Sequence, residues 1–296
     1  MTSRLFERHA AEVRKGLQRR VAPALERHLP HPPSPDLVRA MRAALSGGKA
    51  LRASLCLASA DLFAPRREAW WDVALAMEAM HAYSLAHDDL PAMDNAATRR
   101  GQPSLHVAFG EAAAILAGDA LQSFAFALLA EAQLPSARRV RLLARLAHAA
   151  GAAGMAGGQA LDLAGAARDA PALRRMHGCK TGALIVCAVE AGALSAGASA
   201  QARRALSAWA RALGAAYQLR DDMLDGSGDA ALLGKPLHQD ERRGGNAVQI
   251  LGAAAVRTEL RACQRTAQEM LARLSVPSRE LGILRAAAEF AVARRA

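Results

Sequence analysis

The spacing of apolar and polar positions predicts a chain made of helices. Apolar residues recur at helical intervals along most of the sequence, and no run of alternating β-branched residues indicates a strand. Proline and glycine segments divide the pattern into successive units. The helices are expected at about 3–29, 35–45, 50–64, 68–90, 111–130, 137–163, 182–194 and 201–225, with two more after 246.

Local signals place several of these boundaries. Ser34 followed by Pro35 is typical of a helix start. Pro91 disfavours helical geometry at the residue before it, so the helix from 68 should end near Leu90. No repeat, linker or shift in composition divides the chain. We therefore expect a single all-α domain over 1–296.

A long stretch without periodicity follows the helix at 201–225. It begins at Gly226 and runs to about Asn246, and it includes Lys235 and Pro236. Irregular segments of this length inside a compact domain are often functional lids. We expect this one to take part in a site.

Three carboxylates stand at the end of the predicted helix 68–90. Asp88 and Asp89 fall in its last turn, and Asp94 falls in the turn beyond. A helix C-terminus carries partial negative charge, so acidic residues there need a compensating cation. Hard oxygen ligands without cysteine or regularly spaced histidine suit Mg²⁺ or Mn²⁺.

The helix at 201–225 ends with the same arrangement. Asp221, Asp222 and Asp225 crowd its last turns, and Asp221 and Asp225 share a face because they are four residues apart. One such cluster would suggest no more than a solvated acidic helix end. Two clusters, with the adjacent guanidiniums of Arg99 and Arg100 between them in sequence, indicate a metal-bridged phosphate ester.

Composition fits this picture. Of the 296 residues, 52% are hydrophobic and only 4% aromatic, which favours helices packed through small side chains. The net charge is +11, but arginines are spread among acidic residues and no basic run is interleaved with aromatics, so a nucleic-acid partner is not expected. Lysine is scarce, and its positions suggest places where a compact ammonium is needed: Lys15, Lys49, Lys180 and Lys235.

Other features indicate a cytoplasmic protein. None of Cys56, Cys179, Cys187 and Cys263 forms a CxxC pair, so free thiols in a reducing compartment are expected. The N-terminal residues lack an apolar signal core. The most apolar run, 112–130, contains Asp119, and we interpret it as a core helix instead of a membrane span.

At these motifs the sequence resembles the trans-isoprenyl diphosphate synthases, and among them the bacterial farnesyl diphosphate synthases. The resemblance covers nearly the whole chain. It rests on GGKALR (47–52), HAYSLAHDDLPAMD (81–94), RRGQPSLHVAFGEAAAILAGDAL (99–121), GMAGGQALDL (154–163), KTGALI (180–185) and YQLRDDMLDGSGDAALLGKP (217–236).

The resemblance implies a bundle of roughly ten or more helices around a central cavity, usually as a homodimer. It implies condensation of isopentenyl diphosphate with an allylic diphosphate, assisted by Mg²⁺. The implied metal ligands are Asp88, Asp89 and Asp94, with Asp89 supporting, and Asp221, Asp222 and Asp225. The allylic diphosphate would be held by Arg99, Lys180, Thr181, Gln218 and Lys235, of which Lys180, Thr181 and Gln218 are the catalytic candidates. Isopentenyl diphosphate would be held by Lys49, Arg52, His81 and Arg100.

The product length follows from the direction of the first aspartate helix. The tail of a bound allylic diphosphate should run from Asp88 toward the helix N-terminus, where Tyr83 and Ser84 lie about one turn back. A bulky tyrosine there would close the cavity early, which predicts a C15 product. The alternatives are a geranyl or geranylgeranyl diphosphate synthase, or a non-catalytic partner subunit. Released diphosphate is expected to take the final proton, so neither His81 nor His87 is assigned as a base.

Three segments depart from the family pattern. The first aspartate motif continues with 95–98, NAAT, where the family has further aspartates. Ala50 and Ala53 replace residues that are typically Arg and Pro. Gly245 stands where the family usually has a lysine. These changes suggest a specialised member with one diphosphate contact missing or replaced.

Overall fold

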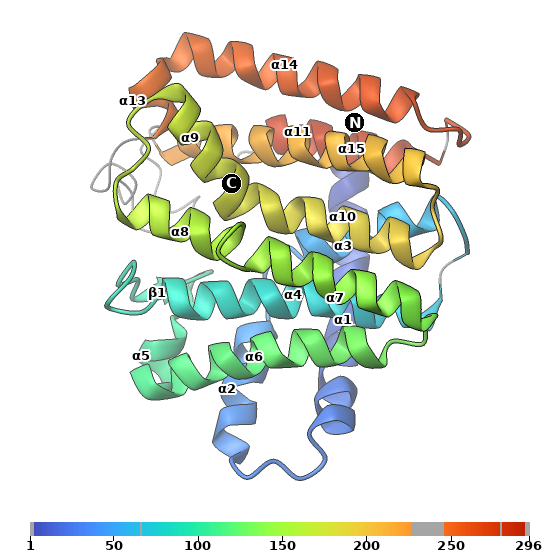
Figure 1. Ribbon diagram of the computed structural model, residues 1–296. Coiled ribbons are helices and arrows are strands. Elements are labelled where there is room, and N and C mark those ends of the chain that lie inside the picture. The colour runs from blue at the N-terminus through green and yellow to red at the C-terminus, as the bar shows by residue number, and fades with distance from the viewer. Residues whose placement is uncertain (1–2, 66, 226–245, 279, 294–296) are drawn as a thin grey trace.

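The computed structural model describes residues 3–65, 67–225, 246–278 and 280–293, and the described chain is almost entirely helical (Figure 1). This confirms the all-α prediction. The helices are α1 (Ser3–His28), α2 (Pro35–Leu45), α3 (Leu51–Asp61), α4 (Glu68–Asp88), α5 (Leu105–Phe109), α6 (Glu111–Glu131), α7 (Ser136–Ala150), α8 (Met155–Leu163), α9 (Ala170–His177), α10 (Ala183–Ser195), α11 (Ala200–Asp225), α13 (Ala247–Leu251), α14 (Ala253–Ala272) and α15 (Gly282–Ala293).

Helices α4, α10 and α11 form the centre of the molecule. Helix α4 packs along α6, α10 packs against α3, α4 and α11, and α14 covers the far side of α11 (Figure 1). Two apolar clusters fill these contacts, one with Trp70 among its buried side chains and one with Trp209. Small residues let helices touch, since a Cβ on Gly192 of α10 would lie 1.9 Å from the carbonyl oxygen of Cys56 on α3.

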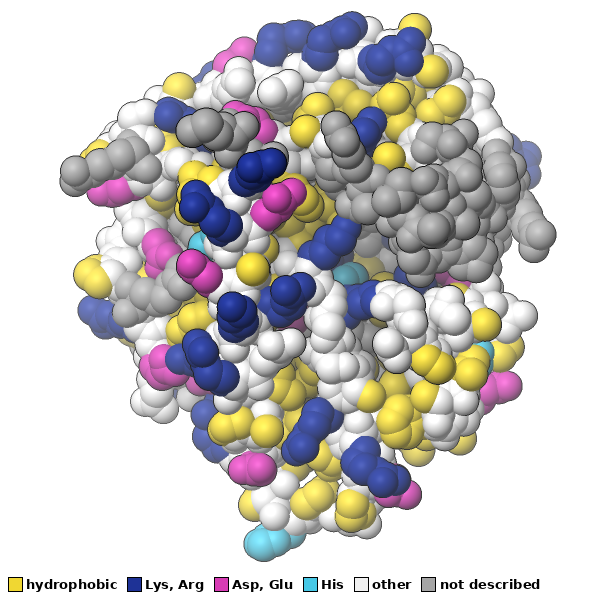
Figure 2. Space-filling view, turned by 180° about the vertical axis from the view of Figure 1, so that it is seen from behind, with side chains coloured by type: hydrophobic (Ala, Val, Ile, Leu, Met, Phe, Trp, Pro, Cys, Tyr) yellow, Lys and Arg dark blue, Asp and Glu magenta, His cyan; other side chains and the backbone are white. Residues whose placement is uncertain are grey.

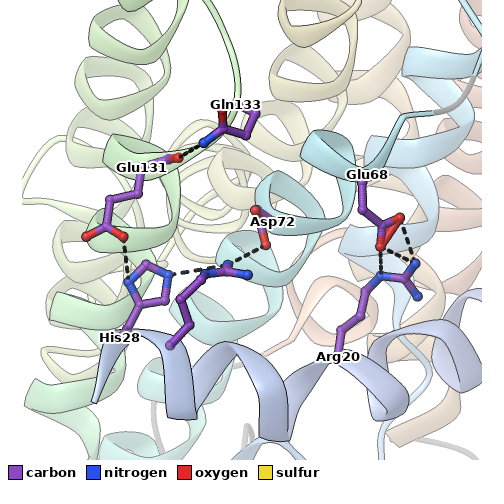
Figure 3. Close-up of polar contacts among 7 residues, drawn as sticks. Arg20, His28, Glu68, Asp72, Glu131 and Gln133 are labelled. Atoms are coloured by element: carbon purple, nitrogen blue, oxygen red, sulfur yellow. Dashed lines mark hydrogen bonds and ion pairs between the residues drawn. The ribbon is translucent and has the colours of Figure 1, made fainter. Parts of the chain in front are cut away.

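Helix α1 is tied to this body by ion pairs (Figure 3). Arg20 pairs with Glu68 at the start of α4, and its guanidinium lies 4.2 Å from the centre of the Trp71 ring. About one turn into α4, Asp72 accepts a hydrogen bond from Arg27 at 2.9 Å. His28 lies 3.2 Å from Glu131 at the end of α6. These contacts hold the N-terminal helix across α4 and α6.

The helix predictions differ from the structure at two places. The unit expected at 137–163 is two helices, α7 and α8, because the backbone leaves helical geometry between Gly151 and Gly154. No helix was predicted between 163 and 182, but α9 and a π-helical turn, Gly178–Gly182, lie there. Asp169 starts α9 by accepting a hydrogen bond from the Ala172 N–H at 2.8 Å, and a proline is tolerated in a first helical turn.

The sequence pattern also failed to predict a short β-hairpin whose strands have two residues each. Strand β1 (Thr98–Arg99) pairs antiparallel with β2 (Gln102–Pro103). The turn residues Arg100 and Gly101 both have positive φ, 55° and 75°, as a type I′ turn requires. The hairpin is too short to show alternation, so its only signal is the Gly101 turn.

Judged by length and composition alone, two helical stretches of the described chain could cross a membrane. They are Glu111–Glu131 and Ala170–Ser195. Both pack against neighbouring helices of the body, α6 against α4 and α2, and α10 against α3 and α11. The packing agrees with the interpretation of 112–130 as a core helix. Figure 2 shows Lys and Arg side chains scattered over one face of the molecule, with Asp and Glu among them, in keeping with the dispersed charge expected from the sequence.

Candidate active site

A cavity of about 570 Å³ lies where α4, α8, the π-helical turn and α11 meet. Most of the residues singled out in the sequence line it: Lys49, Arg52, His81, Tyr83, Ser84, Asp88, Asp94, Arg99, Arg100, Lys180, Thr181, Gln218 and Asp221. Asp89, Asp222 and Asp225 are buried beside it and are absent from its lining. Lys235 and Gly245 lie outside the described residues.

The first acidic cluster sits where α4 ends. The turn after the helix folds back, so the Asp94 N–H donates to the carbonyl oxygen of Asp88 at 2.8 Å and the Ala96 N–H donates to that of Asp89 at 3.1 Å. The carboxylates of Asp88 and Asp94 therefore both line the cavity. Burial raises the pKa of Asp88 from 3.8 to about 7, and the charge of Asp94 adds to the effect while Lys180 opposes it.

Asp89 has a different partner from its neighbour. Its carboxylate accepts two hydrogen bonds from the Arg99 Nε, at 2.9 and 3.2 Å, and forms an ion pair with the same guanidinium. Arg99 stands on β1, so the pair fixes the hairpin against the end of α4. The hairpin thus presents Arg99 and Arg100 to the cavity.

The second acidic cluster divides in the same way. Asp221 lines the cavity, whereas Asp222 accepts from the Gln218 Nε2 at 3.0 Å and from the Ala247 N–H at 2.8 Å. Asp225 is 1% exposed. Gln218 in turn accepts from the Thr181 hydroxyl at 2.8 Å, which joins α11 to the π-helical turn.

Positive charge gathers at another part of the lining. Burial lowers the pKa of Arg52 and of Arg100, and burial followed by the charges of Arg52 and Arg100 lowers the pKa of His81 well below 6.5. Buried nitrogens of Arg52 (Nε) and His81 (Nδ1) have no hydrogen-bond partner within the described chain. Uncompensated donors and buried cations of this kind fit a polyanionic ligand.

Glycines make room for these cations. A Cβ on Gly48 would lie 2.6 Å from the Cζ of Arg100, and Gly48 has φ +78°. Arg100 also reaches the carbonyl oxygen of Ser46 at 3.4 Å. The Gly47–Gly48 turn before Lys49 therefore leaves space for the side chain of Arg100, which lies in the hairpin turn.

Several residues in or beside the lining were given no role from the sequence. Asp162, which does not line the cavity itself, forms an ion pair with Lys180 at 2.5 Å. The amide of Gln159 is buried in the lining, and neither of its polar atoms is hydrogen-bonded to a described residue. The GGQALDL segment was the available signal, since it places both side chains near one another on α8. Glu78 and Tyr217 also line the cavity. Of these two, Glu78 had a signal in the sequence, because it lies beside His81 on the same helix.

The acidic residues suit a divalent cation that is shared with a ligand. No three His, Cys, Asp or Glu side chains of the described ranges form a preformed cation cluster. Mg²⁺ is commonly held by one or two carboxylates together with substrate phosphates, so such a cluster is not required. Asp88, Asp94 and Asp221 line one cavity from two helices, and the raised pKa of Asp88 indicates a carboxylate that lacks sufficient positive charge.

Comparison with known proteins supports this picture. The chain is 42% identical over 292 residues to farnesyl diphosphate synthase of Escherichia coli K12, covering 96% of this chain and 95% of that one. It is 43% identical to farnesyl diphosphate synthase of Geobacillus stearothermophilus over 75% of this chain and 77% of that one. A geranylgeranyl diphosphate synthase of Cyanophora paradoxa is 41% identical over 66% and 67% of the two chains.

Solved structures agree in fold. An FPP/GFPP synthase from Zymomonas mobilis superposes with a TM-score of 0.84 at 37% identity, covering 98% of this chain and all of the other. A geranyltransferase from Helicobacter pylori, complexed with magnesium and isoprenyl diphosphate, gives a TM-score of 0.78 at 29% identity over 93% and 95% of the chains. The polyprenyl synthetase family model matches residues 34–275. By sequence, fold and the residues around its cavity, the chain belongs to the polyprenyl synthetase family.

Proposed function

We propose that this prenyltransferase joins isopentenyl diphosphate to an allylic diphosphate, head to tail, and releases farnesyl diphosphate (C15). The observation that carries the proposal is the single cavity in which Asp88, Asp94 and Asp221 share a lining with buried arginines and Lys180. Such a cavity is suited to two diphosphates and to the cations that neutralise them. Several farnesyl diphosphate synthases among the relatives support the same product.

The allylic diphosphate is assigned to the acidic side. Asp88, Asp94 and Asp221 would hold Mg²⁺, or Mn²⁺ in its place, and the metal would supply charge neutralisation to the leaving diphosphate. Asp89 supports them by orienting Arg99, and Asp222 and Asp225 support them as buried residues of α11. Lys180, Thr181 and Gln218 bind and orient the leaving group, and Lys235, outside the described residues, belongs with them by family resemblance.

Lys180 is held charged at the wall of the cavity. Its ammonium forms an ion pair with Asp162, and this pair keeps the lysine charged although burial would lower its pKa. A diphosphate arriving beside Lys180 meets an ammonium that is already aimed into the cavity. Preorganised charge of this kind is a large contributor to catalysis because little reorganisation is needed during the reaction.

Isopentenyl diphosphate is assigned to Lys49, Arg52, His81 and Arg100. His81 is neutral because its pKa lies well below 6.5, so it serves as a hydrogen-bond donor to the diphosphate. In the reaction the allylic C–O bond breaks, the alkene of isopentenyl diphosphate attacks the allylic carbon, and one proton is lost. The departing diphosphate takes that proton, so no side chain is assigned as the base.

Tyr83 and Ser84 are assigned to the floor of the cavity. Both line it on α4, one turn before Asp88. The Tyr83 ring is held edge-on against His87 with centroids 5.1 Å apart, and the Ser84 hydroxyl donates to the carbonyl oxygen of His81 at 2.9 Å. A fixed aromatic ring at this depth sets a C15 limit.

Incubating the purified protein with Mg²⁺, isopentenyl diphosphate and a C5, C10 or C15 allylic partner tests the proposal. We expect C15 product from the C5 and C10 partners, no extension of the C15 partner, and no product in EDTA. A C10 or C20 product would assign the geranyl or geranylgeranyl alternative. Absence of any condensation with Mg²⁺ or Mn²⁺ would leave the partner-subunit alternative and overturn the proposal.

We also propose that the enzyme is a cytoplasmic homodimer. The four cysteines are free thiols, which suits a reducing compartment. Adjacent helices α5 and α6 expose three large apolar side chains, Val107 at 54%, Ile115 at 43% and Leu116 at 55%. Exposed large apolar side chains on adjoining helices suit a protein–protein contact.

A further inference from the structure

A second cavity, of about 750 Å³, lies between α7, α9, α10, α11 and α14. Its volume falls in the range of small-molecule sites, roughly 300–1,000 Å³. The residues assigned to the condensation reaction do not line it. The two cavities share their walls, since Lys180 and Thr181 of the π-helical turn face the first cavity while Gly178 and Gly182 face the second.

Helix α11 separates the cavities in the same way. Its Gln218 and Asp221 line the first cavity, and its Arg211 and Leu219 line the second. His177, which lines the second cavity, lies 3.5 Å from the carboxylate of Asp222, and Asp222 accepts from Gln218. The wall is therefore one layer of helix thick and is crossed by hydrogen bonds.

The lining combines an apolar interior with guanidiniums at its edge. Leu173, Val186 and Leu219 contribute aliphatic surface. Arg145 and Arg174 are paired with Glu190 and Glu259, yet their side chains remain 60% and 56% exposed.

Of the three arginines that line the cavity, Arg211 has no acidic partner among the described residues. Arg211 lines the cavity, is exposed, and makes no hydrogen bond or ion pair with any described residue. His148, which also lines the cavity, makes none either. Guanidiniums bind phosphates and carboxylates through paired N–H donors, so an anionic head at this edge and an apolar chain inside would match the lining.

We propose that this second cavity binds an amphipathic anion, an aliphatic chain with a phosphate or carboxylate head. The head lies at Arg211 with Arg145 and Arg174 nearby, and the chain lies against the apolar interior. The site is independent of the condensation proposed above, because it uses none of the residues assigned to that reaction.

Cys263 provides a local reporter of occupancy. It lines the second cavity and is partly exposed, whereas Cys187, also in the lining, is buried and has its pKa raised to about 12 by that burial, so it reacts slowly. Cys179 is partly exposed but lines neither cavity, and it serves as the internal control. The rate of alkylation by N-ethylmaleimide at each cysteine can be followed by peptide mass mapping of the full chain.

The experiment is run in EDTA, so that metal-assisted binding in the first cavity does not contribute. Dodecyl phosphate, dodecanoate and uncharged dodecanol are compared below their aggregation concentrations. At ten times its dissociation constant a bound anion should slow Cys263 alkylation about tenfold and leave Cys179 unchanged. Stronger protection by the phosphate or by the carboxylate identifies which head the site prefers.

A matched pair of variants on α11 tests the role of charge. Arg211→Gln should raise the half-protecting concentration about tenfold, because a charge-assisted contact is lost. Arg204→Gln, an exposed arginine on the same helix away from the cavity, should have no effect. The proposal is overturned if neither anion protects Cys263, if dodecanol protects equally well, or if the two variants behave alike.

Discussion

At the scale of single residues, neighbouring aspartates are made different by their contacts. Asp88 and Asp89 are adjacent in sequence, and burial raises the pKa of both carboxyls, but Asp89 is paired with Arg99 whereas Asp88 lines the cavity. Asp221 and Asp222 divide in the same way. One aspartate of each pair therefore lines the cavity, and the other fixes the structure that presents it.

The raised pKa of Asp88 predicts proton release on metal binding. The folded pKa of about 7 lies above the ordinary value of 3.8, so the metal-free carboxyl is about half protonated at pH 7. A bound cation lowers that pKa, so binding of Mg²⁺ with diphosphate at pH 7 should release about half a proton, falling toward zero by about pH 9. The release can be measured by calorimetry in two buffers of different ionisation enthalpy.

The sign of the effect on stability follows from the same pKa. The folded state holds this proton more tightly than the unfolded state, so metal-free protein should lose stability as the pH rises from about 4 through 7. Asp88→Asn removes the group and is the control for both measurements. If that variant released as many protons as the parent, Asp88 would not be the titrating ligand.

Tyr83 is predicted to limit product length. Tyr83→Ala removes the ring that lies edge-on to His87 and should open the cavity toward the N-terminus of α4, giving products longer than C15. Tyr83→Phe keeps the ring without the hydroxyl and should still give C15. Product sizing by chromatography distinguishes these results, and an unchanged length in Tyr83→Ala would show that another residue forms the floor.

At the scale of secondary structure, the sequence predicts what is decided locally. The starts of α2 and α4 were anticipated because caps, prolines and helical periodicity act within a few residues. The break between α7 and α8 was not, because its alanines and glycines are compatible with a continuous helix until tertiary packing decides. The π-helical turn likewise depends on contacts with α8 and α11 that no local pattern shows.

Close packing of α8 on the π-helical turn is predicted to position Lys180. A Cβ on Gly158 would lie 2.1 Å from the backbone nitrogen of Lys180, so Gly158→Ala must displace the turn. A shift of about 1 Å at catalytic groups can cost on the order of 100-fold, and kcat/KM should fall by about that factor. Steady-state kinetics at saturating Mg²⁺ would measure it.

Gly178 supplies the matched control for this prediction. It lies in the same π-helical turn, but a Cβ there would meet no atom within 4 Å. Gly178→Ala should therefore retain activity within a few-fold of the parent. Equal activity in the two variants would show that the turn accommodates the added methyl group and that the contact between α8 and Lys180 is not critical.

At the scale of the whole molecule, the site depends on residues brought together from most of the chain. Thirteen of the residues chosen from the sequence line one cavity, because motifs at the ends of α4 and α11 and in the loops between helices converge there. Gln159, Asp162 and Tyr217 were given no role, because the pairing of Asp162 with Lys180 and the place of the other two in the lining depend on the tertiary structure. The second cavity was not anticipated from the sequence, because helices far apart in the chain form its lining.

The exposed apolar face of α5 and α6 is predicted to be the dimer contact. Val107, Ile115 and Leu116 lie on helices that pack together, so burying them against a second copy would remove three large apolar side chains from water. Leu116→Asp would bury an unpaired charge in that contact and should weaken association by about 2–5 kcal/mol. Light scattering after size-exclusion chromatography should show a dimer for the parent and a monomer for the variant.

Val140→Asp is the control, because Val140 is 64% exposed on α7, away from this face, and the variant should remain dimeric. A parent that is monomeric at micromolar concentration, or a Leu116→Asp variant as dimeric as Val140→Asp, would place the contact elsewhere.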